Sequence, residues 1–151
     1  MRVGVLALQG AVAEHIRSLE KTGVEGVTVK HVEQLADLDG LIIPGGESTT
    51  IGKLMRKYGF IEAIRDFSGQ GKPIFGTCAG LIVMAKEIEG GEEPHLALMD
   101  IKVSRNAFGR QRESFETDLD VKGLEAPLRA VFIRAPLITA VGDGVEVLST
   151  Y

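Results

Sequence analysis

The most constraining feature of this sequence is its single cysteine, Cys78, which has a glycine two residues away on each side. The segment before it, Ile74-Phe75, is typical of a short strand, and the segment that begins at Ala79 is typical of a helix. A sharp strand-to-helix turn strains its central residue and leaves room only for small neighbours, which Gly76 and Gly80 provide. The spacing therefore predicts a nucleophile elbow at the carboxyl end of a strand.

The chain before this elbow alternates between strand-like and helix-like segments. Short apolar runs predict buried strands, and apolar residues three and four apart among charged ones predict amphipathic helices. The predicted strands are 3–8, 27–32, 41–43 and 74–75, and the predicted helical segments are 12–22, 33–38, 48–57, 61–67 and 79–87. This alternation predicts an α/β fold with a mostly parallel sheet.

The chain after Gly91 has a different pattern. Residues 101–103, 114–121, 130–134 and 145–148 have strand-like composition without long helical patterns between them. We expect added antiparallel strands here, some of them at a sheet edge. No repeat, low-complexity tract or linker marks a second domain, so we expect one α/β domain over residues 1–151.

Composition narrows the possible functions. A chain of 151 residues with 44% hydrophobic positions is long enough to bury one core. Its net charge of -4 offers no basic surface for nucleic acid or anionic lipid. No apolar run approaches the roughly 20 residues that span a bilayer, and no signal-peptide pattern is present, so we expect a cytosolic protein. One cysteine forms no internal disulfide, and a cysteine-rich metal site is not expected.

The predicted elbow also gives Cys78 a chemical environment. The positive end of the following helix favours a thiolate, which is the nucleophilic form of cysteine. The backbone N–H of Ala79 is placed to face a developing oxyanion. The alternative is a buried, inert cysteine, which is common for this residue type.

A second glycine-rich turn, Pro44-Gly45-Gly46-Glu47-Ser48, ends another predicted strand and opens a helix. In a doubly wound sheet both loops emerge at the edge where ligands bind. Two glycines let backbone N–H groups turn toward a ligand, so Gly46 is the candidate for the second oxyanion donor. The alternative is a simple helix entry with Ser48 as the N-cap and Glu47 favourable to the helix dipole, which does not explain two consecutive glycines.

PGGEST at residues 44–49 and GTCAGL at residues 76–81 together resemble the class I, triad-type glutamine amidotransferases. Three further stretches narrow the resemblance to the glutaminase subunit of pyridoxal 5'-phosphate synthase. These are GVLALQGA at residues 4–11, RNAFGRQ at residues 105–111 and FIRAP at residues 132–136. The resemblance extends over essentially the whole chain.

The resemblance implies a flavodoxin-like three-layer α/β sandwich in which Cys78 attacks the side-chain amide of L-glutamine. A γ-glutamyl thioester forms, and ammonia is channelled to the synthase subunit that builds the pyridoxal phosphate ring in vitamin B6 biosynthesis. No metal or organic cofactor is implied for the glutaminase itself, because pyridoxal phosphate is the product of the complex. The residues implied to bind glutamine are Gly46, Glu47, Ser48, Arg105, Ile133 and Arg134.

The chemistry of glutamine agrees with two of these residues. Its α-carboxylate and α-ammonium need a cationic donor and an acidic acceptor, which Arg105 and Glu47 offer. Without the resemblance, the ordinary interpretation of Arg105 is a solvated surface arginine.

Hydrolysis of an amide by cysteine needs a base and an acid, normally a histidine oriented by a carboxylate. The resemblance places this pair in a His-Pro-Glu-like motif near the C-terminus, which residues 1–151 do not contain. We assign surface or interface roles to His15, His31 and His95, and expect His15 on the same sheet edge as Cys78. We therefore expect a C-terminally incomplete domain with little activity, because losing one triad member costs about 10⁴ to 10⁶ in rate.

Two other functions remain open. The first is another cysteine-elbow hydrolase, such as a peptidase or a glyoxalase-like enzyme. The second is a fragment that binds the synthase without hydrolysing glutamine. A glutamine analogue that labels Cys78 distinguishes the first, because such hydrolases have no reason to recognise an α-amino acid head group. Binding to the synthase without hydrolysis of glutamine supports the second.

Overall fold

The computed structural model describes residues 1–105 and 114–151. The stretch 106–111 of the RNAFGRQ motif therefore lies outside the described residues. The elements in chain order are β1 (Arg2–Leu6), α1 (Val12–Lys21), β2 (Glu25–Val29), the 3₁₀ helix η1 (Val32–Asp37), β3 (Gly40–Ile43), α2 (Ser48–Lys57), α3 (Phe60–Gly69), β4 (Ile74–Gly76), α4 (Ala79–Met84), β5 (Ala85–Ile88), β6 (Met99–Ser104), β7 (Phe115–Leu119), β8 (Leu128–Phe132) and β9 (Leu137–Val141).

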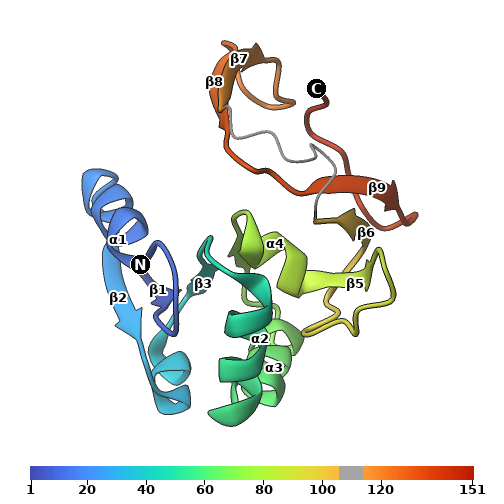
Figure 1. Ribbon diagram of the computed structural model, residues 1–151. Coiled ribbons are helices and arrows are strands. Elements are labelled where there is room, and N and C mark those ends of the chain that lie inside the picture. The colour runs from blue at the N-terminus through green and yellow to red at the C-terminus, as the bar shows by residue number, and fades with distance from the viewer. Residues whose placement is uncertain (106–113) are drawn as a thin grey trace.

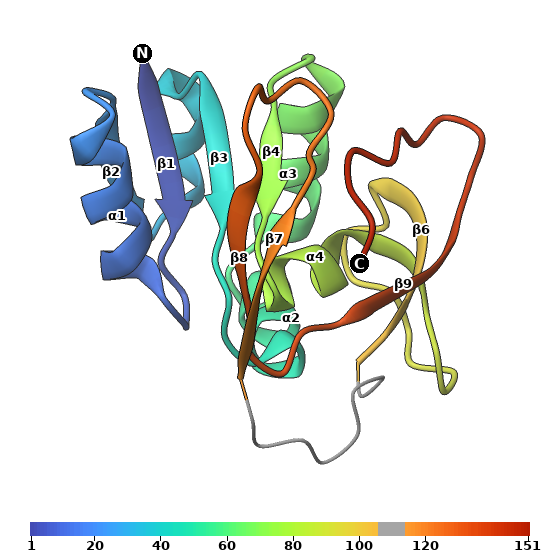
Figure 2. The same cartoon turned by 90° about the horizontal axis from the view of Figure 1, so that it is seen from above.

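The first four strands form a parallel sheet in the order β2-β1-β3-β4. Helix α1 lies on one face of this sheet, and η1, α2 and α3 lie on the other (Figures 1 and 2). The strand order reverses between β1 and β3, so the loops that follow these two strands leave toward opposite faces. Such a switch point at the carboxyl edge of a parallel sheet is where α/β proteins bind ligands.

The main core lies between the parallel sheet and helices α2 and α3. Leu6 and Ile43 on the strands pack with Ile51 and Met55 of α2 and with Phe60 of α3, and all five are essentially inaccessible to solvent. Burial of this size holds α2 rigidly against the sheet. A second, smaller cluster of buried residues lies around β5 and β6.

The predicted α/β fold is confirmed, and so are the added antiparallel strands: β6 pairs with β9, and β7 pairs with β8. The helix predicted over 79–87 is wrong in its second half, because α4 ends at Met84 and β5 follows. Ala85 and Ile88 are buried while Lys86 and Glu87 are exposed, and β5 pairs in parallel with β6. Pairing with β6 thus overrides the helix preference of the Ala-Lys-Glu run.

The strand predicted over 145–148 is also wrong, because these residues have no regular structure. The strand that pairs with β6 in the antiparallel direction is instead β9, which precedes these residues. Val145 contacts the second core cluster without joining a sheet. Its apolar character therefore reflects packing and not strand pairing.

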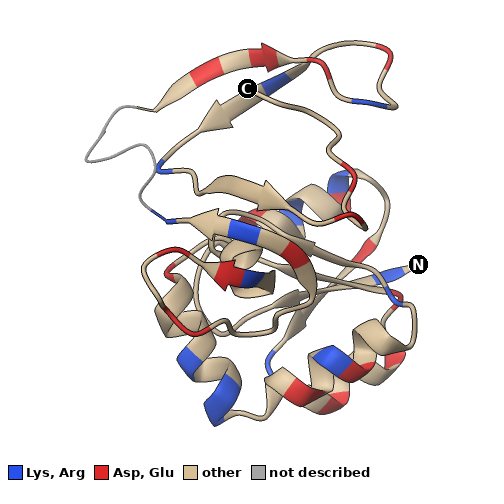
Figure 3. Ribbon diagram, turned by 90° about the vertical axis from the view of Figure 1, so that its right-hand side faces the viewer, with Lys and Arg blue, Asp and Glu red and all other residues tan. Residues whose placement is uncertain are grey.

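The β7–β8 hairpin is set apart from the parallel sheet in Figure 1. Phe115 and Phe132 stack across its two strands with 4.9 Å between ring centroids. Arg129 forms ion pairs of 3.1 Å with Glu116 and with Asp118 on the neighbouring strand, where Figure 3 shows the acidic and basic positions side by side. The hairpin is therefore stabilised by contacts between its own strands and by Tyr151, whose ring packs against both phenylalanines.

Helices α1, α2 and α3 have ten residues each, and α4 has six. A search of the described residues for a helix with the length and hydropathy needed to cross a bilayer returns none.

The buried core makes a direct prediction. Replacing Phe60, which is 0% exposed, by alanine should lower the free energy of unfolding by about 3–5 kcal/mol, because the ring leaves a cavity in the main core. Tyr58 is two residues away and 51% exposed, so Tyr58→Ala should cost less than about 1 kcal/mol. Urea unfolding of both variants checks this, and similar losses for the two would contradict the described core.

Candidate active site

Cys78 lies at the turn between β4 and α4, where the predicted nucleophile elbow is confirmed. Its backbone has φ 50° and ψ -107°, a strained conformation for a residue other than glycine. The thiol-bearing residue is exposed. Strained backbone conformations of this kind cluster at active sites, where the position of a side chain is maintained at a cost in folding stability.

The two glycines of the elbow are required by close approach. A Cβ atom on Gly80 would collide with the carbonyl oxygen of Ile43 on β3, and a Cβ atom on Gly76 would lie 2.6 Å from the carbonyl carbon of Gly80. The N–H of Thr77 donates to the same Ile43 oxygen at 3.1 Å. The elbow is therefore locked onto the end of β3, the strand that leads into the second glycine-rich turn.

This second turn meets the elbow directly. A Cβ atom on Gly45 would lie 3.3 Å from the Cβ atom of Cys78, so the two loops are in van der Waals contact. The loop after β1 joins them, because the N–H of Ala11 donates to the Gly45 oxygen at 2.9 Å and the N–H of Glu47 donates to Oε1 of Gln9 at 2.8 Å. Three loops thus converge at the carboxyl edge of the sheet, and Gln9 is a member of the site that sequence reasoning did not single out.

The two predicted oxyanion donors both belong to these loops. Within the described residues, neither the N–H of Gly46 nor that of Ala79 has a hydrogen-bond acceptor. Each is adjacent to one of the two residues, Gly45 and Cys78, at which the loops touch. Their role as an oxyanion hole stays a prediction.

Glu47 is the N-cap of α2, which corrects the alternative that gave this position to Ser48. Its carboxylate accepts the backbone N–H groups of Thr49 at 3.2 Å and Thr50 at 2.7 Å, and also the Thr50 hydroxyl. The hydroxyl bond is the largest of the effects that lower the pKa of Glu47 to about 2. Glu47 is therefore an anion at neutral pH, whereas Ser48 is the first helical residue and is buried.

Arg105, at the end of β6, reaches this capping carboxylate. Its Nη2 lies 3.3 Å from Oε1 of Glu47, and its Nη1 donates to Oγ1 of Thr49 at 3.2 Å. The same Nη1 donates to Oε2 of Glu92 at 2.6 Å. The structure thus brings the predicted pair Arg105 and Glu47 together at the start of α2, beside the glycine turn that touches Cys78.

Ile133 and Arg134 follow strand β8 and are not joined to the other predicted residues. Within the described part of the chain, no hydrogen bond or ion pair links either of them to Cys78, Glu47 or Arg105. Ile133 is 63% exposed, and Arg134 has a positive φ of 46°. Their contact with substrate stays a prediction.

The three histidines lie in different environments. The Nε2 atom of His15 is 2.9 Å from Oγ1 of Thr77, so His15 does lie beside the elbow, as expected from the sheet edge. His31 is the exposed N-cap of η1. His95 is only 5% exposed, so the surface role expected for it is wrong. It is buried because its ring packs against Gly52 of α2.

Comparison with known proteins gives consistent matches. A protein named pyridoxal 5'-phosphate synthase subunit PdxT from Niallia circulans is 78% identical over 151 residues, which is all of this chain and 80% of the relative. A protein of the same name from Anoxybacillus flavithermus is 62% identical over the whole chain and 79% of the relative. The chain therefore spans about four-fifths of the length of these relatives.

Solved structures agree with the fold. A crystal structure of a glutamine amidotransferase has a TM-score of 0.93 and 52% identity, covering 99% of this chain and 79% of that one. The fold is thus the flavodoxin-like arrangement of the class I amidotransferases. The structure of PurLQS from Thermotoga maritima has a TM-score of 0.70 at 19% identity, covers 99% of this chain and 74% of that one, and shows a shared fold alone.

A family model matches nearly the entire chain. The match covers residues 5–151 and carries the description SNO glutamine amidotransferase family. It includes the elbow at Cys78, the glycine turn at Gly45-Gly46 and the arginine at Arg105 that the structure assembles at one sheet edge. On the evidence of this match, of the close relatives and of the shared site, the chain belongs to the SNO glutamine amidotransferase family.

Proposed function

We propose that this chain hydrolyses L-glutamine as the glutaminase subunit of pyridoxal 5'-phosphate synthase. The main observation behind this proposal is that Cys78 is strained, exposed and in contact with the Gly45-Gly46 turn. Relatives that are 78% and 62% identical over the whole chain bear the name of a subunit of that synthase. Another cysteine-elbow hydrolase is a weaker alternative, because Arg105 and Glu47, which meet at the start of α2, match the charges of an α-amino acid head group.

In this mechanism the Cys78 thiolate attacks the side-chain carbonyl carbon of glutamine. The carbonyl oxygen becomes an oxyanion, which the N–H groups of Gly46 and Ala79 stabilise. When the intermediate collapses, the carbon–nitrogen bond breaks, the nitrogen takes the proton that the base removed from the Cys78 thiol, and ammonia leaves. Water then attacks the γ-glutamyl thioester, releases glutamate and restores the thiol.

The head group of glutamine is held at the start of α2. The Arg105 guanidinium binds the α-carboxylate, and the ionised Glu47 accepts from the α-ammonium. The two oxygens of Glu47 already accept four hydrogen bonds from α2 and Arg105, but half of its side chain is exposed, so its negative charge is open to the approaching α-ammonium. Ser48 contributes backbone, since its side chain is buried, and Ile133 and Arg134 complete the pocket from the β8–β9 connection.

The base that serves Cys78 is proposed to come from a histidine–glutamate pair beyond Tyr151, which makes residues 1–151 an incomplete glutaminase domain. The histidines within the chain have other partners: His15 bonds Thr77, and His95 lies buried beside Arg56 and Glu92. The chain covers about four-fifths of these relatives, so about a fifth of each lies outside the match. The remaining alternative is a form that binds the synthase without catalysis.

The proposal includes a hetero-oligomer with the ring-building synthase subunit and the cytoplasmic location expected from the sequence. Ammonia is mostly protonated at neutral pH and then lacks a nucleophilic lone pair. Direct transfer to the partner keeps it reactive. The glutaminase subunit uses no metal or organic cofactor in this scheme.

Extension of the chain tests the position of the missing base. Joining the residues of the Niallia circulans relative that follow its match to Tyr151 should raise glutamine hydrolysis by about 10⁴-fold or more, because a complete triad acts as a unit. Glutamate release in the presence of the synthase subunit measures this. Equal activity of the 151-residue and extended chains would place the base within residues 1–151, with His15→Ala as the next variant to assay.

Replacement of the nucleophile tests the function itself. In the extended chain, Cys78→Ala should lower glutamine hydrolysis by at least about 10⁴-fold, because no other group forms the thioester. Binding to the synthase subunit should be unchanged, and this serves as the control for folding. Hydrolysis at the unsubstituted rate in Cys78→Ala would refute the proposed mechanism.

A further inference from the structure

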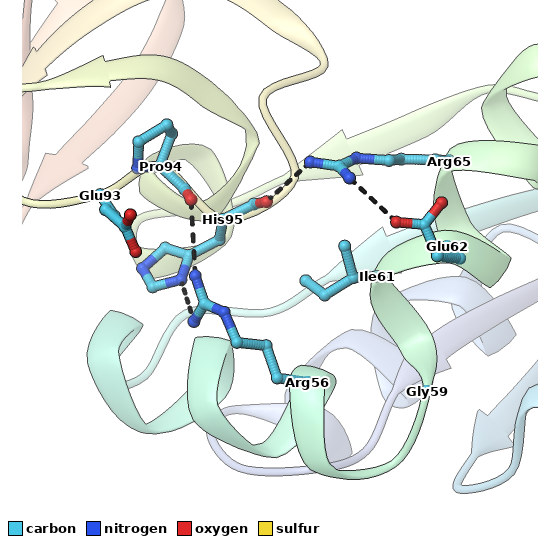
Figure 4. A pocket seen from close by; sticks show the side chains of 8 residues that line it. All are labelled: Arg56, Gly59, Ile61, Glu62, Arg65, Glu93, Pro94 and His95. Atoms are coloured by element: carbon cyan, nitrogen blue, oxygen red, sulfur yellow. Dashed lines mark hydrogen bonds and ion pairs between the residues drawn. The ribbon is translucent and has the colours of Figure 1, made fainter.

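The connection between β5 and β6 is held in place by two arginines from the helices below it. Arg65 of α3 donates through Nε to the oxygen of Leu96 at 3.1 Å and through Nη2 to the oxygen of His95 at 3.2 Å. Arg56 of α2 reaches the oxygen of Pro94 at 3.5 Å. Figure 4 shows both guanidinium groups directed at this connection across a cavity of about 450 Å³. The connection is therefore fixed although it has no regular structure.

His95 extends this anchoring into the interior. Its Nδ1 lies 3.1 Å from Nη1 of Arg56, and because arginine can only donate, Nδ1 is the acceptor and the ring proton resides on Nε2. Burial lowers the pKa of His95, and the charge of Arg56 lowers it further, so the ring is neutral at pH 7. Gly52 of α2 lies directly against the ring, where a Cβ atom would collide with Nδ1. The orientation of His95 is thus set from two sides.

Glu92 joins this anchored histidine to the active site. Its Oε1 lies 3.5 Å from Nε2 of His95, which forms no hydrogen bond among the described residues, so the neutral ring is a close neighbour of Glu92 and not an ion-pair partner. Its Oε2 accepts from Nη1 of Arg105 at 2.6 Å. The Glu92 side chain is 28% exposed, so most of it is shielded from water. A continuous line of contacts therefore runs from Arg56 through His95 and Glu92 to Arg105.

We propose that Glu92 is a positioning residue that holds the Arg105 guanidinium ready for the α-carboxylate of glutamine, with the buried His95 ring beside Glu92 limiting where its carboxylate can move. The inference rests on the proposed function, in which Arg105 binds that carboxylate. A free arginine side chain has many rotamers, and fixing it before substrate arrives removes that entropic cost from binding. Its bonds to Glu92, Thr49 and Glu47 use three of the five N–H donors, which leaves donors at Nη2 and Nε for the substrate.

This positioning can be tested without catalysis by measuring how well L-glutamine protects Cys78 from alkylation. Iodoacetamide alkylates Cys78, and the glutamine concentration that halves the alkylation rate reports binding at the site. In Glu92→Ala this concentration should rise by about tenfold, while the alkylation rate without glutamine should stay within about twofold of the unsubstituted chain. Glu93→Ala is the matched control, because Glu93 is the neighbouring exposed carboxylate and should leave both values unchanged.

A double substitution separates positioning from a general loss of structure. If Glu92 acts through Arg105, the effect of Glu92→Ala should vanish in an Arg105→Ala background. An effect that persists there, or a half-protection concentration in Glu92→Ala equal to or below that of the unsubstituted chain, would overturn the inference. Glu92→Gln, which keeps the shape and lacks the charge, should show the same direction of change and replaces Glu92→Ala if that variant does not fold.

The outcome also distinguishes the inference from the function on which it rests. If L-glutamine gives no protection of the unsubstituted chain, the proposed glutamine site is wrong and the inference falls with it. If glutamine protects the unsubstituted chain and Arg105→Ala weakens that protection, the site stands. In that case Glu92→Ala alone decides whether Glu92 positions the arginine.

Gly52→Ala gives a second, independent test. Alanine favours a helix more than glycine does, so propensity alone predicts a variant with unchanged or improved stability. Its Cβ atom would displace the His95 ring, so we expect the glutamine concentration for half-protection to rise by about three- to tenfold. Protection equal to that of the unsubstituted chain would show that His95 does not fix Glu92.

Discussion

The contact between the end of β3 and the Cys78 elbow is the constraint on which the site depends. The Ile43 carbonyl accepts from Thr77 and faces Gly80 so closely that no side chain fits there. This contact fixes the strained backbone of Cys78 and directs the Gly45-Gly46 turn to the same place. Strain of this kind persists only where the surrounding structure imposes it, and the buried core beneath α2 and α3 supplies that support.

The charged residues are organised around the start of α2. Glu47 caps this helix and meets Arg105, which also contacts Glu92 and Thr49. Helix α2 is held by fully buried side chains, so the head-group contacts are built on a rigid element and not on a free loop. The nucleophile and the groups proposed to hold the α-amino acid end of glutamine therefore depend on one packed layer.

Sequence patterns predict the features of this fold that depend on residues close together in the chain. The glycine spacing around Cys78 is sufficient to predict the elbow, because only small residues fit that turn. The role of Arg105 is predicted only by the family resemblance. Features that depend on distant partners were not predictable. β5 forms through pairing with β6, and His95 is buried by Gly52, which lies more than forty residues earlier. Glu47, and not Ser48, caps α2, because its carboxylate accepts the N–H groups of Thr49 and Thr50 while the Ser48 side chain is buried.

Labelling of Cys78 by a diazoketone analogue of glutamine, followed by intact mass and peptide mapping, shows whether glutamine binds at this cysteine. A glutamine site at Cys78 predicts one adduct per chain, located on Cys78, whose formation L-glutamine slows. It also predicts little protection by L-asparagine, whose shorter side chain places the amide away from the thiol when its head group is bound. No adduct, or an adduct that forms at the same rate with and without glutamine, would contradict a glutamine site at Cys78.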